Sequence, residues 1–135
     1  MASTITNRTQ ALAQYAIDKD LSGASLGGVN LSAAVFSGAD FHRADLSLAD
    51  LTGTDLTNCI LSQANLSKAI CAGTNFTGSD FSFTDFHKVD LSTAIGIGGF
   101  GTNSGIANLD RDKPYGDPSG KPKIKAAKNA IKVGP

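Results

Sequence analysis

The chain has 135 residues, of which 41% are hydrophobic and 18% are charged, and its 12 Lys and Arg residues balance 12 acidic ones. This length and composition allow one small domain with a narrow core and argue against a disordered chain. Every acidic residue is Asp, and Lys is scarce before the last quarter of the chain, so a helical bundle, whose exposed faces use Glu and Lys, is not expected.

Residues 8–18 are predicted to form a short helix within an N-terminal cap that we assign to residues 1–18. Thr9 is the expected N-cap residue, because its hydroxyl can accept a hydrogen bond from the first turn. Leu12, Tyr15 and Ala16 form an apolar stripe at helical spacing. This stripe favours packing on the rest of the chain, and the alternative for Tyr15 is a role in binding.

A five-residue repeat runs through residues 19–95. Leu or Phe recurs at every fifth position, and only Cys71 interrupts the series with a different small hydrophobic residue. Internal repeats of this regularity indicate a solenoid. The fifteen centres are the predicted core: Leu21, Leu26, Leu31, Phe36, Phe41, Leu46, Leu51, Leu56, Leu61, Leu66, Cys71, Phe76, Phe81, Phe86 and Leu91.

A period of five fits neither a helix, which repeats every 3.6 residues, nor a strand, which repeats every two. A coil that turns a corner every five residues keeps every centre inside, and four units then complete one square turn. Small residues two positions before the centres, such as Ala39 and Ala44, fill the remaining interior. Asp or Asn precedes most centres because these short side chains bond to neighbouring backbone in turns, which Glu does less well.

The units at residues 39–43, 44–48 and 49–53 follow the pattern Ala-Asp-(Leu/Phe)-X-X. Over residues 19–95 the chain thereby resembles the pentapeptide repeat family. The resemblance implies an all-β fold, a right-handed quadrilateral β-helix of about four coils, and little about activity. Residues twenty apart then stack in columns, one of which contains Asn30, Asp50, Ile70 and Asp90. A forty-residue similarity within the repeat suggests either duplication of a two-coil block or shared consensus.

Some outward positions are apolar where the repeat usually has Asp, Asn, Gly or another polar residue. They are Val35, Leu48, Ile60, Ile70 and Phe83. Scattered exposed apolar side chains are common in proteins, and the alternative is a contact patch for a partner or a second copy. Ile60 and Phe83 belong to adjacent coils on one side, so they are the candidate interface pair.

Residues 96–135 are predicted to be an extended Gly/Pro-rich basic tail, with a possible short helix at 124–133. Ile95, Ile97 and Phe100 are expected to cover the last coil. Residues 19–95 carry eight Asp against four basic residues, a net charge of −4, whereas the tail carries seven basic residues against three Asp, a net charge of +4. The tail is therefore a candidate docking element for an acidic protein face, and the alternatives are phosphate, an anionic membrane or a merely solvated tail, which is the commonest interpretation of such a composition. Its candidate interface residues are Lys121, Lys123, Lys125, Lys128 and Lys132.

No motif for catalysis, a cofactor or a metal is present, so we expect none of these and no enzyme activity. His42 and His87 are predicted to lie about two coils apart, too far to share a metal ion. Cys59 and Cys71 take inward positions on opposite faces of one coil, which favours reduced thiols in the core over a disulfide.

These features favour a non-enzymatic protein–protein interaction or structural component, such as a scaffold or a subunit of a larger assembly. A protein partner or a homo-oligomer is expected. Direct nucleic-acid binding is not expected. Bases stack on aromatic side chains, and Tyr115 is the only aromatic residue among the tail lysines. The alternative implied by the resemblance is a DNA-mimicking regulator of a topoisomerase, although a net charge of −4 is a poor match to a long acidic rod.

The sequence shows neither a transmembrane segment nor a signal peptide. The uncharged stretch at residues 21–39, for example, is rich in Ser, Gly and Asn. A cytoplasmic location is therefore expected, and a processed form from another compartment would have the same sequence.

Overall fold

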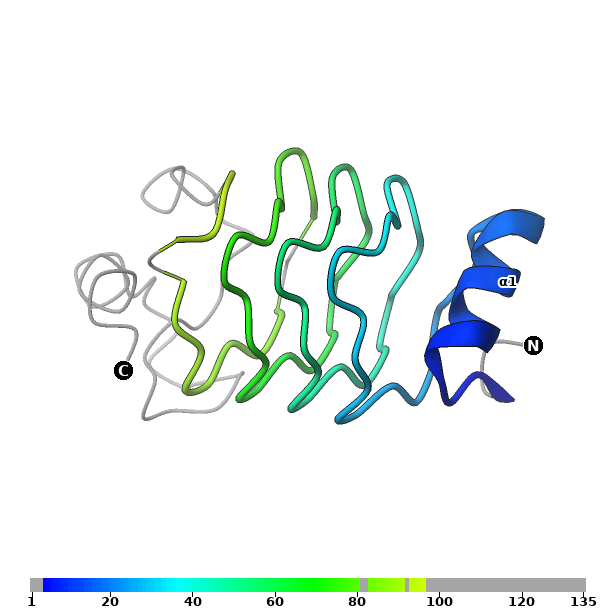
Figure 1. Cartoon of the computed structure of the whole chain (residues 1–135), viewed down its shortest axis with the longest axis horizontal. Coiled ribbons are helices and arrows are strands. Elements are labelled where there is room, and N and C mark those ends of the chain that lie inside the picture. Colours follow the sequence, from blue (N-terminus) through cyan, green and yellow to red (C-terminus); the bar gives the residue numbers. More distant parts are fainter. Residues whose placement is uncertain (1–3, 81–82, 92, 97–135) are drawn as a thin grey trace.

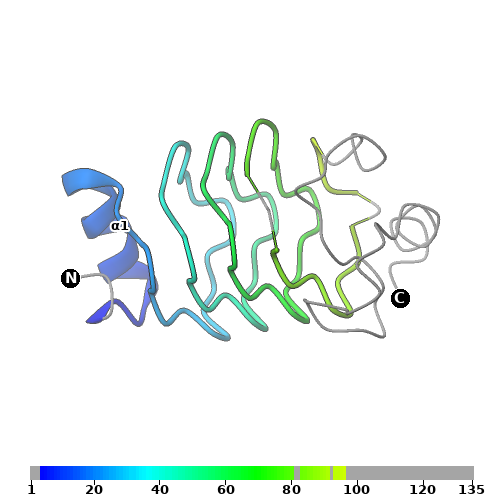
Figure 2. The same ribbon diagram turned by 180° about the vertical axis from the view of Figure 1, so that it is seen from behind.

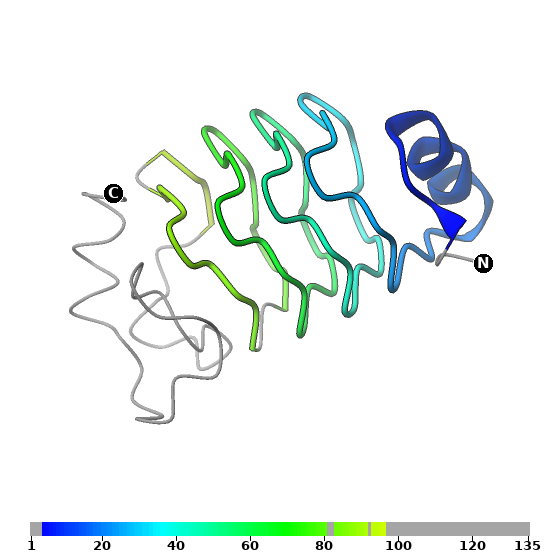
Figure 3. The same ribbon diagram turned by 90° about the horizontal axis from the view of Figure 1, so that it is seen from below.

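The structure, a computed structural model, describes residues 4–80, 83–91 and 93–96. Helix α1 (Arg8–Asp18) lies across one end of a stack of coils that follow one another along a single axis (Figure 1). The coils have similar outlines when seen from behind (Figure 2) and from below (Figure 3). Within these described ranges, no helix is long and apolar enough to cross a membrane.

Parallel bridges between residues twenty apart connect successive coils, and the described residues contain no longer strand. Since four five-residue units separate bridged residues, each coil has four faces. We number the coils 1 to 4, as residues 20–39, 40–59, 60–79 and 80–96. The bridged columns define the faces: Asp20, Asp40, Ile60 and Asp80 on face 1; Ser25, Asp45, Asn65 and Asp85 on face 2; Asn30, Asp50 and Ile70 on face 3; Val35, Asp55, Asn75 and Ile95 on face 4.

One predicted column is shorter than expected. Asp90 was expected to continue the stack of Asn30, Asp50 and Ile70, but Asp90 makes no bridge to Ile70. Coils 3 and 4 are therefore paired on faces 1, 2 and 4 and not on face 3.

A tight turn at each corner gives the five-residue period its physical cause. The amide of Ala39 donates to the carbonyl of Phe36 at 2.9 Å, and the amide of Ala44 donates to Phe41 at 2.9 Å. The third residue of the turn has a positive φ, for example 78° at Gly38 and 60° at Arg43. This is the geometry of a type II turn, which favours Gly or Asn at that position.

The repeat centres form the core. All fourteen centres within the described residues are buried to a relative exposure of 1% or less, and Phe81 lies outside the described residues. Rings pack edge-to-face along the interior, with centroids 5.4 Å apart for Phe36 and Phe41 and 5.9 Å apart for Phe76 and Phe86. Burial of these side chains is the main source of stability.

Buried hydroxyls in the interior are satisfied by backbone of the preceding coil. Thr54 donates to the carbonyl of Leu31 at 2.8 Å, and Thr74 donates to that of Leu51 at 2.6 Å. The thiol of Cys59 donates to Phe36 in the same way at 3.1 Å. The small inward position can therefore hold Ala, Thr, Ser or Cys without leaving a buried polar group unpaired.

The Asp residues on the faces stabilise the turns that follow them by accepting hydrogen bonds from the residue two positions later. Oδ1 of Asp50 accepts from the amide of Thr52 at 3.0 Å and from its hydroxyl at 2.6 Å. Asp20 accepts from the amide and hydroxyl of Ser22 at 3.0 and 2.6 Å. Both bonds stabilise the charged carboxylate and so lower the pKa of Asp20 and of Asp50 from 3.8. The bond from the hydroxyl has the larger effect, and the bond from the amide has the smaller one. These local bonds account for the use of Asp at these positions, as the sequence indicates.

Helix α1 occupies the predicted residues, but its N-cap is Asn7 and the prediction of Thr9 is wrong. The side chain of Asn7 accepts from the amide of Gln10 at 2.8 Å, and the Gln10 side chain accepts from the amide of Thr6 at 2.8 Å. This reciprocal pair resembles a capping box. Because the helix starts one residue after Asn7, Thr9 already lies within its first turn.

The buried side of α1 also differs in part from the predicted stripe. Leu12 and Tyr15 pack on the core, whereas Ala16 is exposed and Ala11 is fully buried. The apolar stripe that packs on the core therefore contains Ala11, Leu12 and Tyr15, and it includes Ala11 in place of the predicted Ala16.

Side chains of the N-terminal segment replace the missing coil before coil 1. Nη1 of Arg8 donates to the carbonyl of Ser32 at 2.9 Å and to that of Asn30 at 3.3 Å. The amide of Ser25 donates to the carbonyl of Ile5 at 2.9 Å. Equivalent groups in later coils bond to the coil before them, so these contacts close an otherwise open edge.

At the other end, Ile95 does not cover the last coil as expected. It bridges Asn75 and continues face 4 with its side chain 52% exposed. Ile97, Phe100 and the possible helix at 124–133 lie outside the described residues.

Candidate functional site

The candidate interface pair lies on one side of the solenoid. Ile60 is bridged to Asp40 and Asp80 on face 1, and its side chain is 44% exposed. Phe83 follows Asp80 by three residues at the next corner, and its side chain is 54% exposed. The structure thus places Ile60 and Phe83 in coils 3 and 4, on and beside the same face.

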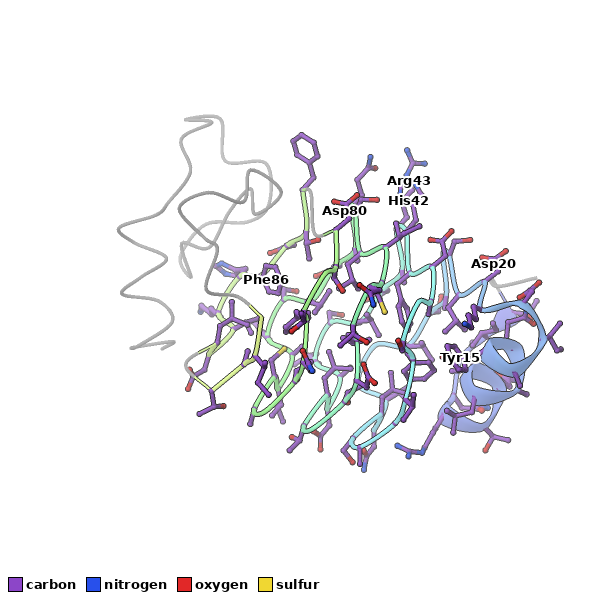
Figure 4. The ribbon with its side chains drawn as sticks, turned by 90° about the horizontal axis from the view of Figure 1, so that it is seen from above. Tyr15, Asp20, His42, Arg43, Asp80 and Phe86 are labelled. Atoms are coloured by element: carbon purple, nitrogen blue, oxygen red, sulfur yellow. The ribbon has the colours of Figure 1, made fainter. Side chains whose placement is uncertain are left out.

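The neighbouring side chains at this corner form lateral contacts between coils. Nδ1 of His42 lies 2.8 Å from the hydroxyl oxygen of Ser62, and Nε of Arg43 donates to the side-chain oxygen of Gln63 at 3.0 Å. His42 and Arg43 project outward together along the edge of the stack (Figure 4). The register of twenty continues this corner column from Arg43 through Gln63 to Phe83.

The other outward apolar residues predicted from the sequence do not join this pair. Val35 is on face 4, Ile70 is on face 3, and Leu48 is at the corner after face 2; their exposures range from 52% to 61%. Among the described residues, Ile17 on α1 is the most exposed large apolar side chain, at 75%, and it was not singled out from the sequence. Ile17 falls outside the buried stripe of α1. Its exposure could have been predicted from its spacing of two residues from Tyr15, because residues two apart lie on different sides of a helix.

The titratable groups of the described residues are spread over several faces of the solenoid. Among the described residues, no group of three His, Cys or Asp side chains is placed to hold a metal ion. His42 is paired with Ser62, whereas Nδ1 of His87 is buried and has no hydrogen-bond partner within the described part of the chain.

Both cysteines are free and buried, in agreement with the prediction of reduced core packing. Burial raises the pKa of Cys59 and of Cys71 to about 12. Neither thiol is therefore activated as a nucleophile near neutral pH.

The candidate lysines of the tail lie outside the described residues: Lys121, Lys123, Lys125, Lys128 and Lys132. Of the candidate interface residues, Ile60 and Phe83 belong to the described residues, where they lie in adjacent coils on and beside face 1.

Bridged coils around a hydrophobic interior, with one end closed by a helix, define a β-helix solenoid repeat protein. The family model for pentapeptide repeats matches residues 20–58 and 59–95 with eight copies, which is more than half of the chain. The chain belongs to the pentapeptide repeat family. Members of this family are known to form right-handed quadrilateral β-helices.

Solved structures of the same family are similar to this chain over the repeat. A pentapeptide repeat protein from the thylakoid lumen of Arabidopsis thaliana is 36% identical, with 53% of this chain and 54% of that chain covered and a TM-score of 0.42. The protein Rfr23 from the cyanobacterium Cyanothece 51142 is 27% identical, with 56% and 52% covered and a TM-score of 0.39.

QnrB1, a plasmid-mediated fluoroquinolone resistance protein, is 26% identical, with 56% of this chain and 45% of that chain covered and a TM-score of 0.38. The chain thus spans about half the length of these three structures. The comparison with curated proteins found no match.

Proposed function

We propose that the protein is a non-enzymatic protein–protein interaction or structural component, and a subunit of a larger assembly. Residues 19–95 act as a rigid right-handed quadrilateral block, residues 1–18 cap it, and residues 96–135 dock on a partner or a second copy. The handedness is that of the family. The observation that carries the proposal is the exposed pair of Ile60 and Phe83 on one side of the block.

Rigidity supports this function because it lowers the entropic cost of binding. Adjacent coils are tied by backbone bonds such as Phe41 amide to Ile60 carbonyl at 2.7 Å and Ile60 amide to Ala39 carbonyl at 3.0 Å. Since Ile60 is held on both sides in this way, its side chain is presented at a fixed place. A partner therefore pays little to order the surface that it contacts.

The corner turn gives a second line of support. Phe83 has a φ of 59°, the positive value that this turn requires of its third residue, as at Arg43 with 60°. Because the turn sets this backbone conformation, the side chain of Phe83, which is 54% exposed, is presented beside face 1.

The test replaces both apolar side chains by charges, as Ile60→Asp with Phe83→Asp. We expect this variant to keep its circular dichroism spectrum and to lose self-association or partner binding, measured by light scattering and by pull-down. The matched control is Val35→Asp with Leu48→Asp, which charges two apolar residues away from face 1. Unchanged mass and unchanged partner recovery in the Ile60 and Phe83 variant would contradict the interface.

The docking role of the tail is tested separately. A chain ending at Gly101 is compared with the full chain in the same pull-down, and we expect the shorter chain to recover fewer partners. A second variant replaces Lys125, Lys128 and Lys132 by Ser and keeps the chain length. If both variants recover the same partners as the full chain, the tail is not the docking element.

A DNA-mimicking regulator of a topoisomerase is the second candidate. The observation in its favour is the direct stacking of Asp20 on Asp40 on face 1, which places two carboxylates in successive coils. A DNA gyrase supercoiling assay separates the candidates. Specific inhibition that is lost on Asp20→Asn with Asp40→Asn would favour the mimic over the proposed interaction component.

A further inference from the structure

The backbone ladder between coils 3 and 4 is interrupted on face 3. It is intact on the other faces, where the amides of Leu61, Leu66 and Phe76 donate to the next coil at 2.7, 2.8 and 2.8 Å. On face 3 the equivalent groups are the amide of Cys71 and the carbonyl of Ala69. No bond from this amide or to this carbonyl is recorded among the described residues.

A groove of about 410 Å³ opens at this interruption, between Lys68, Ala69, Ile70, Cys71 and Ala72 of coil 3 and Lys88, Asp90 and Thr93 of coil 4. Its size lies within the range of small-molecule sites. The side chain of Thr93 spans part of the gap, because its hydroxyl oxygen accepts from the amide of Gly73 at 3.2 Å. The hydroxyl hydrogen of Thr93 is then still able to donate.

Two lysines, Lys68 and Lys88, line the groove. Lys68 and Lys88 are twenty residues apart in the corner column after face 2, with φ of 59° and 58°, so both side chains leave the same corner of successive coils. Successive coils are separated by about 4.8 Å, the spacing of paired strands. Two cations that leave neighbouring coils at one corner repel each other, and an anion bound by both offsets that repulsion. The lining contains one carboxylate, Asp90, so its net charge is positive.

The floor of the groove is apolar. Ile70 is 52% exposed, and Ala72 is also exposed. A cationic edge beside an apolar floor matches a ligand that combines one negative group with a small hydrocarbon group.

We propose that this groove binds an oxyanion, a carboxylate or a phosphate, that is attached to a small apolar group. The oxyanion accepts from the hydroxyl of Thr93 and the ammonium groups of Lys68 and Lys88, and it lies beside the interrupted backbone at Cys71, whose amide reports its binding. The apolar group lies over Ile70. This site is separate from the Ile60 and Phe83 surface, and the inference does not rest on the proposed interaction function.

The test is a titration of the ¹⁵N-labelled full chain, followed by NMR at constant ionic strength and pH 7. The probes are sodium acetate, sodium butyrate and inorganic phosphate. We expect a saturable shift of the Cys71 amide, with butyrate binding more tightly than acetate because of its extra contact with Ile70. The comparison of phosphate with acetate identifies which oxyanion the groove prefers.

Variants locate the binding. Lys68→Ala with Lys88→Ala is expected to weaken binding by about tenfold or more, whereas Lys68→Arg with Lys88→Arg keeps the charges and keeps binding. Arg43→Ala removes a cation at another corner and is the matched control. The proposal is overturned if the Cys71 amide shows no saturable shift with any probe. It is equally overturned if the alanine pair binds as well as the unaltered chain.

Discussion

The hydroxyl of Tyr15 donates a hydrogen bond of 2.7 Å to the carbonyl of Ser37, while its ring stands edge-on to Phe36 with 5.7 Å between the ring centroids. One side chain thus covers the end of the core and satisfies a backbone group at the exposed edge of coil 1. Figure 4 shows Tyr15 at the junction of α1 and the coils. Capping in this protein therefore depends on a few side chains that can be altered one at a time.

Removing only the hydroxyl, with Tyr15→Phe, is expected to lower the free energy of unfolding by about 1 kcal/mol, because the Ser37 carbonyl loses a neutral donor. Tyr15→Ala also removes the ring from Phe36 and is expected to cost more, about 2–3 kcal/mol, because the ring is partly buried. Urea unfolding at pH 7 measures both. Equal stability of the phenylalanine variant and the unaltered chain would show that the bond to Ser37 does not contribute.

Adjacent inward and outward positions should respond very differently to truncation. Phe36→Ala removes a fully buried ring and is expected to cost about 3–5 kcal/mol. Val35→Ala, one residue earlier and 55% exposed, is expected to change stability by less than about 0.5 kcal/mol. Thermal and urea unfolding of the two variants check this, and similar losses at both positions would argue against the assigned register.

Acid should weaken the solenoid through its face carboxylates. The pKa of Asp20 and of Asp50 is lowered in the folded state from 3.8, so their contribution is full above that value and is lost as pH falls through the lowered pKa. Asn accepts the same bonds without titrating, as Asn30 does from Ser32 at 2.9 and 2.6 Å. The Asp20→Asn with Asp50→Asn variant should therefore lose less stability than the unaltered chain between pH 5 and pH 2, as measured by the urea midpoint. If the urea midpoints of both proteins fall equally with pH, the prediction is contradicted.

The thiols should be inert in the native protein. Cys59 and Cys71 are each 1% exposed, and burial raises the pKa of both to about 12. Reaction with a disulfide reagent at pH 8 should therefore wait for unfolding, since the thiolate is the reactive form. The check is the labelling rate with and without denaturant. Rapid labelling of two thiols in the native chain would contradict their burial.

Two glycines at left-handed positions should differ in their tolerance of a methyl group. At Gly23, with φ of 70°, a Cβ would meet nothing within 4 Å, so Gly23→Ala is expected to cost only about 1 kcal/mol for its backbone conformation. At Gly96, with φ of 83°, a Cβ would lie 2.5 Å from the backbone nitrogen of Thr77. Gly96→Ala should cost more, because coil 4 must move, and equal unfolding midpoints for the two variants would contradict this.

The interior and the column register could be predicted from the sequence because each depends on a local rule that recurs. A large residue at every fifth position and a turn between centres leave one way to bury the whole series. The relation of Ile60 to Asp80 follows from the same arithmetic, and so does the position of Phe83 at the next corner. The sequence therefore predicts the positions of Ile60 and Phe83 in the stack.

Other features depend on choices that the repeat does not decide. Asn7 and Thr9 are both good N-cap residues, and only the reach of the Asn7 side chain to Gln10 distinguishes them. The interruption on face 3 was not predictable either, because Asp90 occupies a normal Asp position in its unit. The interruption depends on how coil 4 packs on coil 3, and the sequence of neither coil alone determines that packing.

The turn at every fifth residue also restricts how the gene for such a chain can change length. Inserting one codon into a coil would move every later centre out of phase, so that Leu and Phe side chains would face water and Asp would face the interior. Adding five codons preserves the interior but rotates all later side chains by one face. Only a gain or loss of twenty, or of a multiple such as forty, preserves both the interior and the surface columns, which include the stacked pair Asp20 and Asp40.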